Sequence, residues 1–335
     1  MYRLLIAFAA LLLAGFVMYP PPKLSSRLKE WLDSGQYFQH KGHNIFYIDI
    51  VTKANSKAAS SVICLHGFPT SSYDWYKILP DLQKHFHRVV LLDFIGFGFS
   101  DKPVNHTYSI FEQADIVEDL LDNLEINDVH LLAHDYGDTV AQELLSRYNE
   151  KDRSKSLKHT YQILSVCLLN GGIYPETNFP RFTQKILLQP YIGAIASRLM
   201  FFQSFRFSFN KVFGPDTQPA DEELEDFWAA MRWKDGHAIF HRLIKYIPER
   251  QSNKDRWVGV LKDCSIPIKI IYGPADPVNP PIKFIPHSKN TAPKVGLYVL
   301  SENIGHYPQL EDPSGVVEEY LKFLTPLKIA HTQAM

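Results

Sequence analysis

Short apolar segments alternate with amphipathic ones along most of the chain, and this alternation restricts the fold more than any other feature. Strand-like apolar runs lie at residues 44–51, 60–65, 89–94, 129–133, 163–169, 266–272 and 295–300. Apolar residues recur at helical spacing in residues 75–86, 111–124, 139–148 and 316–324. Strands joined by crossover helices form parallel sheets. The pattern predicts an α/β fold in which helices cover both faces of a mostly parallel, twisted sheet.

Residues 170–255 interrupt this alternation. The segment is aromatic, shows a helical pattern, is broken repeatedly by proline and has no strand-like run of its own. We therefore expect an inserted helical lid. The lid divides the predicted core into a first part, residues 36–169, and a second part, residues 256–326.

The charge balance excludes several classes of protein. The chain has 35 basic and 36 acidic residues, so no overall basic field attracts nucleic acid. Its 45% apolar content is too high for a disordered chain. The sequence has no phosphate-binding loop, no metal-spaced His/Cys cluster and no dinucleotide fingerprint. We predict no cofactor, no metal and no nucleic-acid partner.

The N-terminus carries a separate signal. Residues 4–18 contain no polar side chain, and a membrane-spanning helix needs about 20 apolar residues. A cleaved signal peptide is the alternative, but it requires small residues at positions −3 and −1, and Leu13 lies at −3 before a cut after Gly15. We predict that residues 1–22 form a hydrophobic leader that anchors the chain, with residues 4–22 contacting the membrane.

Two features disagree about the side of the membrane on which the body lies. Lys23, Arg27 and Lys29 follow the apolar run and favour a cytosolic body. Asn105 begins an Asn-His-Thr sequon, which predicts a glycoprotein and hence the opposite side. The sequence leaves the side open.

The strongest local motif lies where a predicted strand meets a predicted helix. Residues 133–137 read Ala-His-Asp-Tyr-Gly, with small residues at both ends. This pattern is typical of the nucleophile elbow of α/β-hydrolases, with Asp135 in place of serine. Taken alone, Asp135 is equally well explained as the N-cap of the following helix.

Three further segments favour the nucleophile. Residues 66–69, His-Gly-Phe-Pro, end an earlier strand, and in this fold the N–H of Phe68 forms an oxyanion hole with the N–H of Tyr136. Asp276 follows a late strand and His306 follows the last one. The order nucleophile, acid, histidine is that of α/β-hydrolases.

The loop at residues 93–103 reads DFIGFGFSDKP and fits the pattern D-x-x-G-x-G-x-S-D-K-P. Over residues 36–326 the chain resembles the aspartate-nucleophile branch of the α/β-hydrolase fold, the epoxide hydrolases and haloalkane dehalogenases. The resemblance implies that Asp135 is the nucleophile, that His306 is the base and that Asp276 orients it.

The same resemblance bears on the electrophilic helper. Epoxide hydrolases use lid tyrosines as proton donors, which makes Tyr246 and Tyr191 the candidates. Dehalogenases hold the halide with a tryptophan after the nucleophile and often with an asparagine in the H-G-N-P turn. This chain has Tyr136 and Phe68 there, which disfavours dehalogenation.

Five longer segments resemble one vertebrate subgroup of the family that is associated with the endoplasmic reticulum. They lie at residues 66–78, 108–114, 134–145, 170–177 and 306–313. The resemblance implies a location at the endoplasmic reticulum membrane, with a single N-terminal anchor.

The residue type of the nucleophile indicates the reaction. A carboxylate with a reference pKa of about 3.9 is ionised at neutral pH and needs no base to activate it. Attack on a saturated carbon gives a stable ester, whereas attack on an ester carbonyl gives a reactive anhydride. We expect a two-step, epoxide hydrolase-like enzyme acting on a small apolar or lipid substrate at a membrane. A non-catalytic or regulatory relative and a lipid esterase or acyltransferase remain as alternatives.

Overall fold

The computed structural model describes residues 2, 20–52, 60–154 and 161–334. The apolar run at residues 4–18, on which the predicted anchor depends, lies outside the described residues. In the part of the chain that is described, no helix is long and apolar enough to cross a membrane.

Eight strands form a single sheet in the order β1-β2-β4-β3-β5-β6-β7-β8. Their bounds are β1 Gln36–His40, β2 His43–Val51, β3 Ser61–Leu65, β4 Arg88–Leu92, β5 Asp128–His134, β6 Gln162–Leu169, β7 Ile268–Tyr272 and β8 Gly296–Val299. The pairs β1–β2 and β2–β4 are antiparallel, and every other pair is parallel. The structure confirms the predicted α/β-hydrolase sheet.

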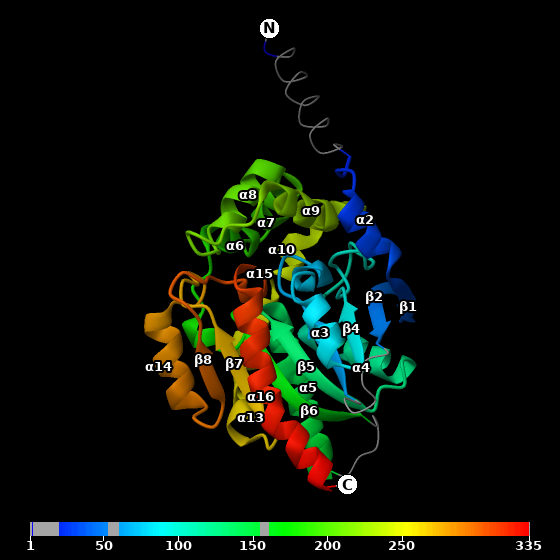
Figure 1. Ribbon diagram of the computed structural model, residues 1–335. Coiled ribbons are helices and arrows are strands. Elements are labelled where there is room, and N and C mark those ends of the chain that lie inside the picture. Colours follow the sequence, from blue (N-terminus) through cyan, green and yellow to red (C-terminus); the bar gives the residue numbers. More distant parts are fainter. Residues whose placement is uncertain (1, 3–19, 53–59, 155–160, 335) are drawn as a thin grey trace.

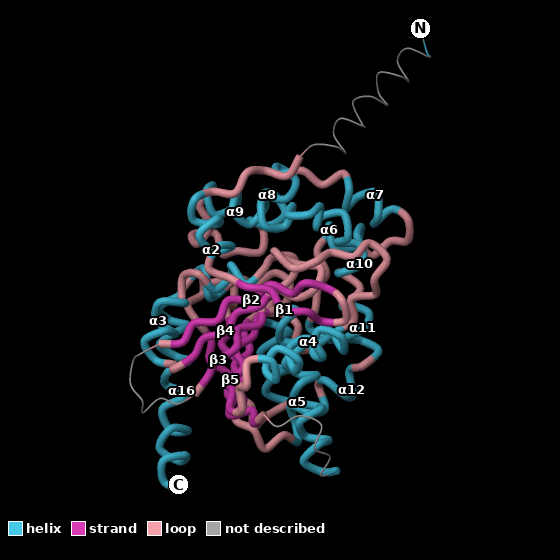
Figure 2. Tube along the Cα trace, turned by 90° about the vertical axis from the view of Figure 1, so that its right-hand side faces the viewer, coloured by secondary structure: helices cyan, strands magenta, loops and turns pink. Residues whose placement is uncertain are grey.

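Helices cover both faces of this sheet. They are α2 Ser26–Asp33, the 3₁₀ turn η1 Ser72–Trp75, α3 Leu79–His85, α4 Ile110–Asn123, α5 Tyr136–Ser154, α14 Pro281–Thr291, α15 Pro308–Glu311 and α16 Pro313–Ala334. Figure 2 shows α3 and α16 on one side of the strands and α4 and α5 on the other. The central strands are buried on both faces, with Val62, Leu91 and Leu131 fully covered, as parallel strands between helical layers require.

Local signals explain several helix boundaries. The Ser109 side chain accepts a hydrogen bond from the N–H of Glu112 and caps α4. The helix expected at residues 75–86 begins only at Leu79, with Pro80 in its first turn, and the residues before it form η1. Helix α14 was not predicted, because Pro281 and Pro286 obscure its periodicity.

The chain between β6 and β7 contains only helical elements among its described residues. They are η2 Pro175–Thr177, α6 Phe182–Leu187, α7 Ile192–Arg198, α8 Phe202–Asn210, α9 Asp221–Arg232, η3 Trp233–Ile239, α10 Phe240–Leu243, α11 Tyr246–Ser252, α12 Lys254–Trp257 and α13 Gly259–Asp263. We call residues 179–252 the lid; this segment begins and ends inside the predicted insert at residues 170–255. Figures 1 and 2 show α6 to α10 gathered at one end of the molecule, beyond the ends of the strands. Helices α12 and α13 pack against α5 instead.

Candidate active site

Asp135 is the single residue between the end of β5 and the start of α5. Its φ angle is +49°, in the left-handed region that a non-glycine residue adopts at an energetic cost. The Asp135 N–H donates to the carbonyl of Asn170 at 3.2 Å, and the Gly172 N–H donates to the carbonyl of Asp135 at 3.1 Å. These bonds hold the strained turn in place.

The side chain of Asp135 does not have the geometry of a helix N-cap. A capping residue has an extended backbone, and its oxygen accepts from an N–H two or three residues later. Here the backbone is left-handed, and Oδ1 accepts from the N–H of Phe68, which lies in the loop after the neighbouring strand β3, at 2.9 Å. The geometry is therefore that of an elbow that presents a carboxylate.

Three glycines allow this close approach. A Cβ on Gly137 would lie 2.2 Å from the carbonyl oxygen of Leu65, and a Cβ on Gly171 would lie 2.4 Å from the Cα of Asp135. A Cβ on Gly67 would lie 2.9 Å from the Cβ of Asp135. The small residues quoted in the sequence motifs therefore have a steric cause, since backbone and side chains pack too tightly for any larger residue.

Three side chains that the sequence places at strand ends meet in the structure. Nδ1 of His306 lies 2.9 Å from Oδ2 of Asp276, and Nε2 of His306 lies 3.4 Å from Oδ2 of Asp135. All three residues are at most 4% exposed. Asp276 also accepts hydrogen bonds from the Val278 N–H at 2.7 Å and from the Asn170 side chain at 3.2 Å. The acid is thus fixed from two sides and orients the imidazole.

The loop that carries His306 is attached to both the core and the lid. The N–H of His306 donates to the carbonyl of Val212, which follows α8, at 2.8 Å. The carbonyl of His306 lies 2.8 Å from Nε2 of His134 in β5. Glu311 accepts from the N–H groups of Gly305 and Tyr307 at 2.7 and 2.9 Å. The backbone of this loop is therefore bonded on each side of the imidazole.

Of the two lid tyrosines proposed as proton donors, only Tyr246 reaches the site. Its hydroxyl lies 3.4 Å from both carboxylate oxygens of Asp135, and its side chain is buried. Tyr191 precedes α7 with a φ angle of +60° and is 88% exposed. The prediction for Tyr191 is therefore wrong in this structure, because the turn after Pro190 directs its ring into solvent.

One of the two predicted oxyanion-hole amides contacts the carboxylate, and the other begins the helix that follows it. The N–H of Phe68 already donates to Asp135 Oδ1. Tyr136 is the first residue of α5, and the N–H groups of a first turn have no acceptor within their own helix. The positive end of the α5 dipole therefore faces the carboxylate. The Tyr136 ring packs edge-on against Tyr246, with 4.9 Å between ring centroids.

The charges of the site hold one another in the ionised state. Burial opposes ionisation of Asp135, but its hydrogen bond to His306 and the charge of His306 lower its pKa to about 2. Burial likewise opposes protonation of His306, but the charge of Asp276 and the contact with Asp135 raise its pKa to about 10. Both shifts favour an imidazolium between two carboxylates.

A model of the α/β-hydrolase fold matches residues 60–313 of the chain. The chain belongs to the α/β-hydrolase fold family. It is 49% identical to the mesoderm-specific transcript protein of Mus musculus over 316 residues, which are 93% of this chain and 92% of that protein. It is 32% identical over 300 residues to a Mycobacterium tuberculosis protein that carries the name hydrolase LipZ, with 90% of this chain and 99% of that protein covered. The match to the mesoderm-specific transcript protein confirms the vertebrate subgroup that the five longer sequence segments predicted.

Solved structures agree on the fold. A haloalkane dehalogenase DbeA variant from Bradyrhizobium elkanii superposes with a TM-score of 0.72 at 21% identity, over 90% of this chain and 99% of that one. The epoxide hydrolase CorEH superposes with a TM-score of 0.67 at 19% identity, over 88% and 99%. At such identities the likeness shows the shared architecture of this family.

Two residues near the site were not singled out by the sequence motifs. Asn170 bridges the two halves of the core, since its side chain accepts from the Gly273 N–H at 2.6 Å and donates to Asp276. Arg250 is 2% exposed and lies one helical turn after Tyr246 on α11. Burial lowers its pKa, while Tyr246, Asp135 and Asp138 act in the opposite direction. The sequence could have indicated Arg250, because residues four positions apart, such as Tyr246 and Arg250, lie on the same face of a helix.

The site opens into a cavity of about 410 Å³ between core and lid. His306, Tyr307 and Phe68 line its inner end, and Leu187 and Phe205 belong to its apolar wall. Among the described residues, no group of three or more His, Cys, Asp or Glu side chains is placed to hold a metal ion. The apolar wall of the cavity is suited to an apolar ligand brought against the charged groups at its inner end.

Proposed function

We propose that the protein is an aspartate-nucleophile hydrolase that opens an epoxide ring in an apolar substrate. The observation that carries the proposal is the environment of the Asp135 carboxylate. One oxygen accepts the Phe68 N–H, the other faces His306, and the Tyr246 hydroxyl lies within 3.4 Å of both. This arrangement supplies a nucleophile, an electrophilic helper and a base at one point.

In the first step, Oδ2 of Asp135 attacks a ring carbon of the epoxide. The carbon–oxygen bond of the ring breaks, its oxygen takes the proton of the Tyr246 hydroxyl, and an alkyl ester of Asp135 forms. The imidazolium of His306 returns a proton to Tyr246. Nε2 of His306 and the Tyr246 hydroxyl each lie 3.4 Å from Oδ2, the atom that reacts.

Ester formation prepares the second step. It removes the negative charge of Asp135, which is one of the two charges that raise the pKa of His306. The neutral imidazole then takes a proton from water as the water oxygen bonds to the ester carbonyl carbon. The Phe68 N–H already contacts the oxygen that becomes negative, and one such donor contributes about 3 kcal/mol.

Collapse of this intermediate breaks the bond between the carbonyl carbon and Oδ2, and the departing alkoxide takes the remaining proton of the water-derived hydroxyl. The diol leaves with the original Oδ2, and the water oxygen remains on Asp135, which is again a carboxylate. The proposal therefore predicts where isotope from H₂¹⁸O appears. Over many turnovers of an epoxide, mass spectrometry of the peptide containing Asp135 should detect ¹⁸O in its carboxylate. Turnover with unlabelled Asp135 would contradict the proposal and favour direct hydrolysis or esterase chemistry. A non-catalytic relative would turn over none of the epoxides, haloalkanes and lipid esters in a screen.

The structure favours epoxide opening over dehalogenation. A halide ion needs donor side chains beside the nucleophile, and the position after Asp135 holds Tyr136. The Tyr136 hydroxyl points away toward the carbonyl of Tyr108, at 3.4 Å. Tyr246 supplies instead the hydroxyl that an epoxide oxygen requires.

A further inference from the structure

The lid exposes an unusual amount of apolar surface. Eight of the fifteen large apolar side chains that are exposed in the described part of the chain lie between Phe179 and Phe207. Buried positions normally follow the apolar stripe of a helix. In α7 this rule is inverted, because Ile192, Ile195 and Leu199 are exposed while Gly193 and Ser197 face the protein.

The same segment is strongly basic. Residues 179–211 contain five arginines and lysines and no acidic residue, so the segment carries +5 in a chain whose net charge is −1. The basic residues are Arg181, Lys185, Arg198, Arg206 and Lys211, of which Arg206 forms an ion pair with Asp221 of α9 at 2.6 Å. Exposed apolar side chains among basic ones are the composition of surfaces that bind the interface of anionic bilayers.

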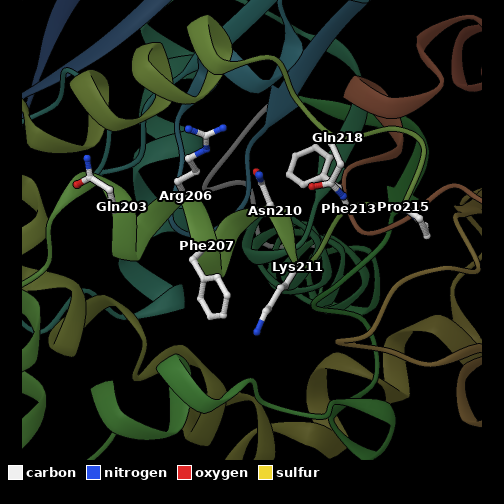
Figure 3. A pocket seen from close by; sticks show the side chains of 8 residues that line it. All are labelled: Gln203, Arg206, Phe207, Asn210, Lys211, Phe213, Pro215 and Gln218. Carbon is white, nitrogen blue, oxygen red and sulfur yellow. The ribbon is translucent and has the colours of Figure 1, made fainter.

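We call the exposed parts of α6, α7 and α8, with Phe182, Ile195 and Phe207 as its apolar residues, the lid face. Figure 3 shows Phe207 and Lys211 projecting together from the end of α8, while Arg206 points away from them. The Lys211 ammonium lies 3.7 Å from the centroid of the Phe207 ring. A lysine that extends along an aromatic ring can place its charge among headgroups while the ring enters the apolar layer.

The active-site cavity reaches this face. Its lining includes His306 at the inner end and Phe182, Phe207 and Arg181 at the outer end. Phe182 is 76% exposed and Phe207 is 65% exposed. The entrance therefore lies between α6 and α8 and is bordered by the residues that make the lid face apolar.

The chain that follows the apolar run at residues 4–18 also enters the fold here. Residues 22–27 line a cavity of about 1010 Å³ together with residues 200–203 of the lid. Arg27 forms an ion pair with Asp226 of α9 at 2.7 Å, which attaches α2 to the lid. Figures 1 and 2 show the first described residues of this segment at the lid end of the molecule.

From these observations we propose that the lid face lies on an anionic bilayer and that a lipid-phase substrate enters the active site directly from it. The surface part of the proposal stands on exposure, charge and the path of the chain. The substrate route rests on the proposed function.

A test uses the full chain in vesicles of phosphatidylcholine and phosphatidylserine that contain brominated lipid. A bimane probe is attached to Ile195→Cys in a Cys264→Ser background, since Cys64 and Cys167 are buried. The matched control is Ile282→Cys on α14, where the native side chain is 79% exposed. We expect several-fold stronger quenching by brominated lipid at position 195 than at position 282.

A separate experiment tests whether the basic residues of the lid face contribute to binding. The pair Lys185→Glu and Arg198→Glu should weaken quenching at position 195 in vesicles with phosphatidylserine, whereas Lys283→Glu should not. Equal quenching at positions 195 and 282 would overturn the proposal. Cross-linking between two copies through position 195, without lipid quenching, would assign the face to a second copy and would also overturn it.

The two proposals fail separately. Asp135→Asn should leave the quenching unchanged, and Lys185→Glu with Arg198→Glu should leave turnover of a water-soluble epoxide unchanged. Quenching without turnover of any epoxide would therefore refute the proposed reaction and retain the surface. Turnover of an epoxide without selective quenching at position 195 would refute the bilayer surface and retain the proposed reaction.

Discussion

The two walls of the active site are built on different principles. On the core wall, Asp135, Asp276 and His306 are buried, and each is held by hydrogen bonds from loops that follow different strands. On the lid wall, the Tyr246 hydroxyl faces the carboxylate, and the cavity lining beyond it mixes apolar side chains such as Leu187 and Phe205 with polar ones of the same helices. Many neighbouring side chains face solvent. The comparison suggests that the sheet edge determines the reaction, while the lid determines what reaches it.

The largest effect should follow from removing the charge of the core wall. Asp135→Asn keeps the shape of the side chain but replaces the ionised nucleophile with a neutral amide. We expect kcat/KM for an epoxide to fall by about 10⁴-fold or more. Steady-state kinetics would measure the fall, with circular dichroism as the control for folding. Retention of more than a tenth of the activity would remove Asp135 from the mechanism.

His306→Gln should separate the two steps. Ring opening needs the carboxylate and the Tyr246 proton, and His306 only restores that proton afterwards, whereas the second step needs His306 as its base. The variant should therefore form the ester and then stop. Intact-mass spectrometry should show the protein plus one substrate mass, and Asp135→Asn should show none. A variant that neither turns over nor accumulates the adduct would contradict this separation, because it would mean that ring opening cannot proceed without the proton of His306.

A smaller effect should come from the lid wall. Tyr246→Phe removes the proton donor but keeps the ring that packs on Tyr136. Loss of a general acid costs about 10²–10⁴-fold, and we expect the fall in kcat rather than in KM. Tyr191→Phe is the matched control, because its ring is 88% exposed, and it should behave as the wild type. Equal losses in both variants would contradict the assignment.

The core wall was largely predictable from sequence for a topological reason. Parallel strands end at the same edge of the sheet, so residues that follow β5, β7 and β8 must meet there, however far apart they are in the chain. The central predicted strands, β3 to β6, were short apolar runs that are mostly buried on both faces, a pattern that depends little on neighbours. Strand β1 was missed because its exposed glutamines and the buried polar side chain of His40 obscure the strand pattern. Lys41 and Gly42 turn the chain back with positive φ angles.

The lid wall was much less predictable. Its helices are short, and which of their residues face inward depends on how the turns between them direct each segment. Tyr191 and Tyr246 looked equivalent as lid tyrosines, yet the positive φ angle at Tyr191 turns one outward. In α7 the exposed apolar residues contradict the rule by which periodicity predicts burial. Sequence patterns fail where a surface is selected for something other than packing.

The ionised groups of the core wall should also give stability its pH dependence. The folded-state pKa of His306 is raised from 6.5 to about 10, so its contribution is complete below pH 6.5 and is lost as the pH rises toward 10. The folded-state pKa of Asp135 is lowered from 3.8 to about 2, so its contribution is lost only as the pH falls through that range. Denaturant unfolding of wild type and His306→Gln between pH 6.5 and 10 should converge at the upper end. A constant difference would mean that His306 carries no extra proton.

The smallest effect should be on stability at the lid face, and it tests whether apolar residues there serve folding at all. Leu131→Ala, in the buried strand β5, should lower the free energy of unfolding by about 2–5 kcal/mol, because it leaves a cavity between helical layers. Ile195→Ser removes an apolar side chain of the same composition that is 60% exposed, and it should change the free energy by less than about 0.5 kcal/mol. Urea unfolding measures both. If Ile195→Ser were as costly as Leu131→Ala, the exposed side chains of α7 would be part of the folded core, and the argument that they are kept for contact with a bilayer would lose its basis. A near-zero value would mean that an apolar residue is retained at a position where folding does not require it.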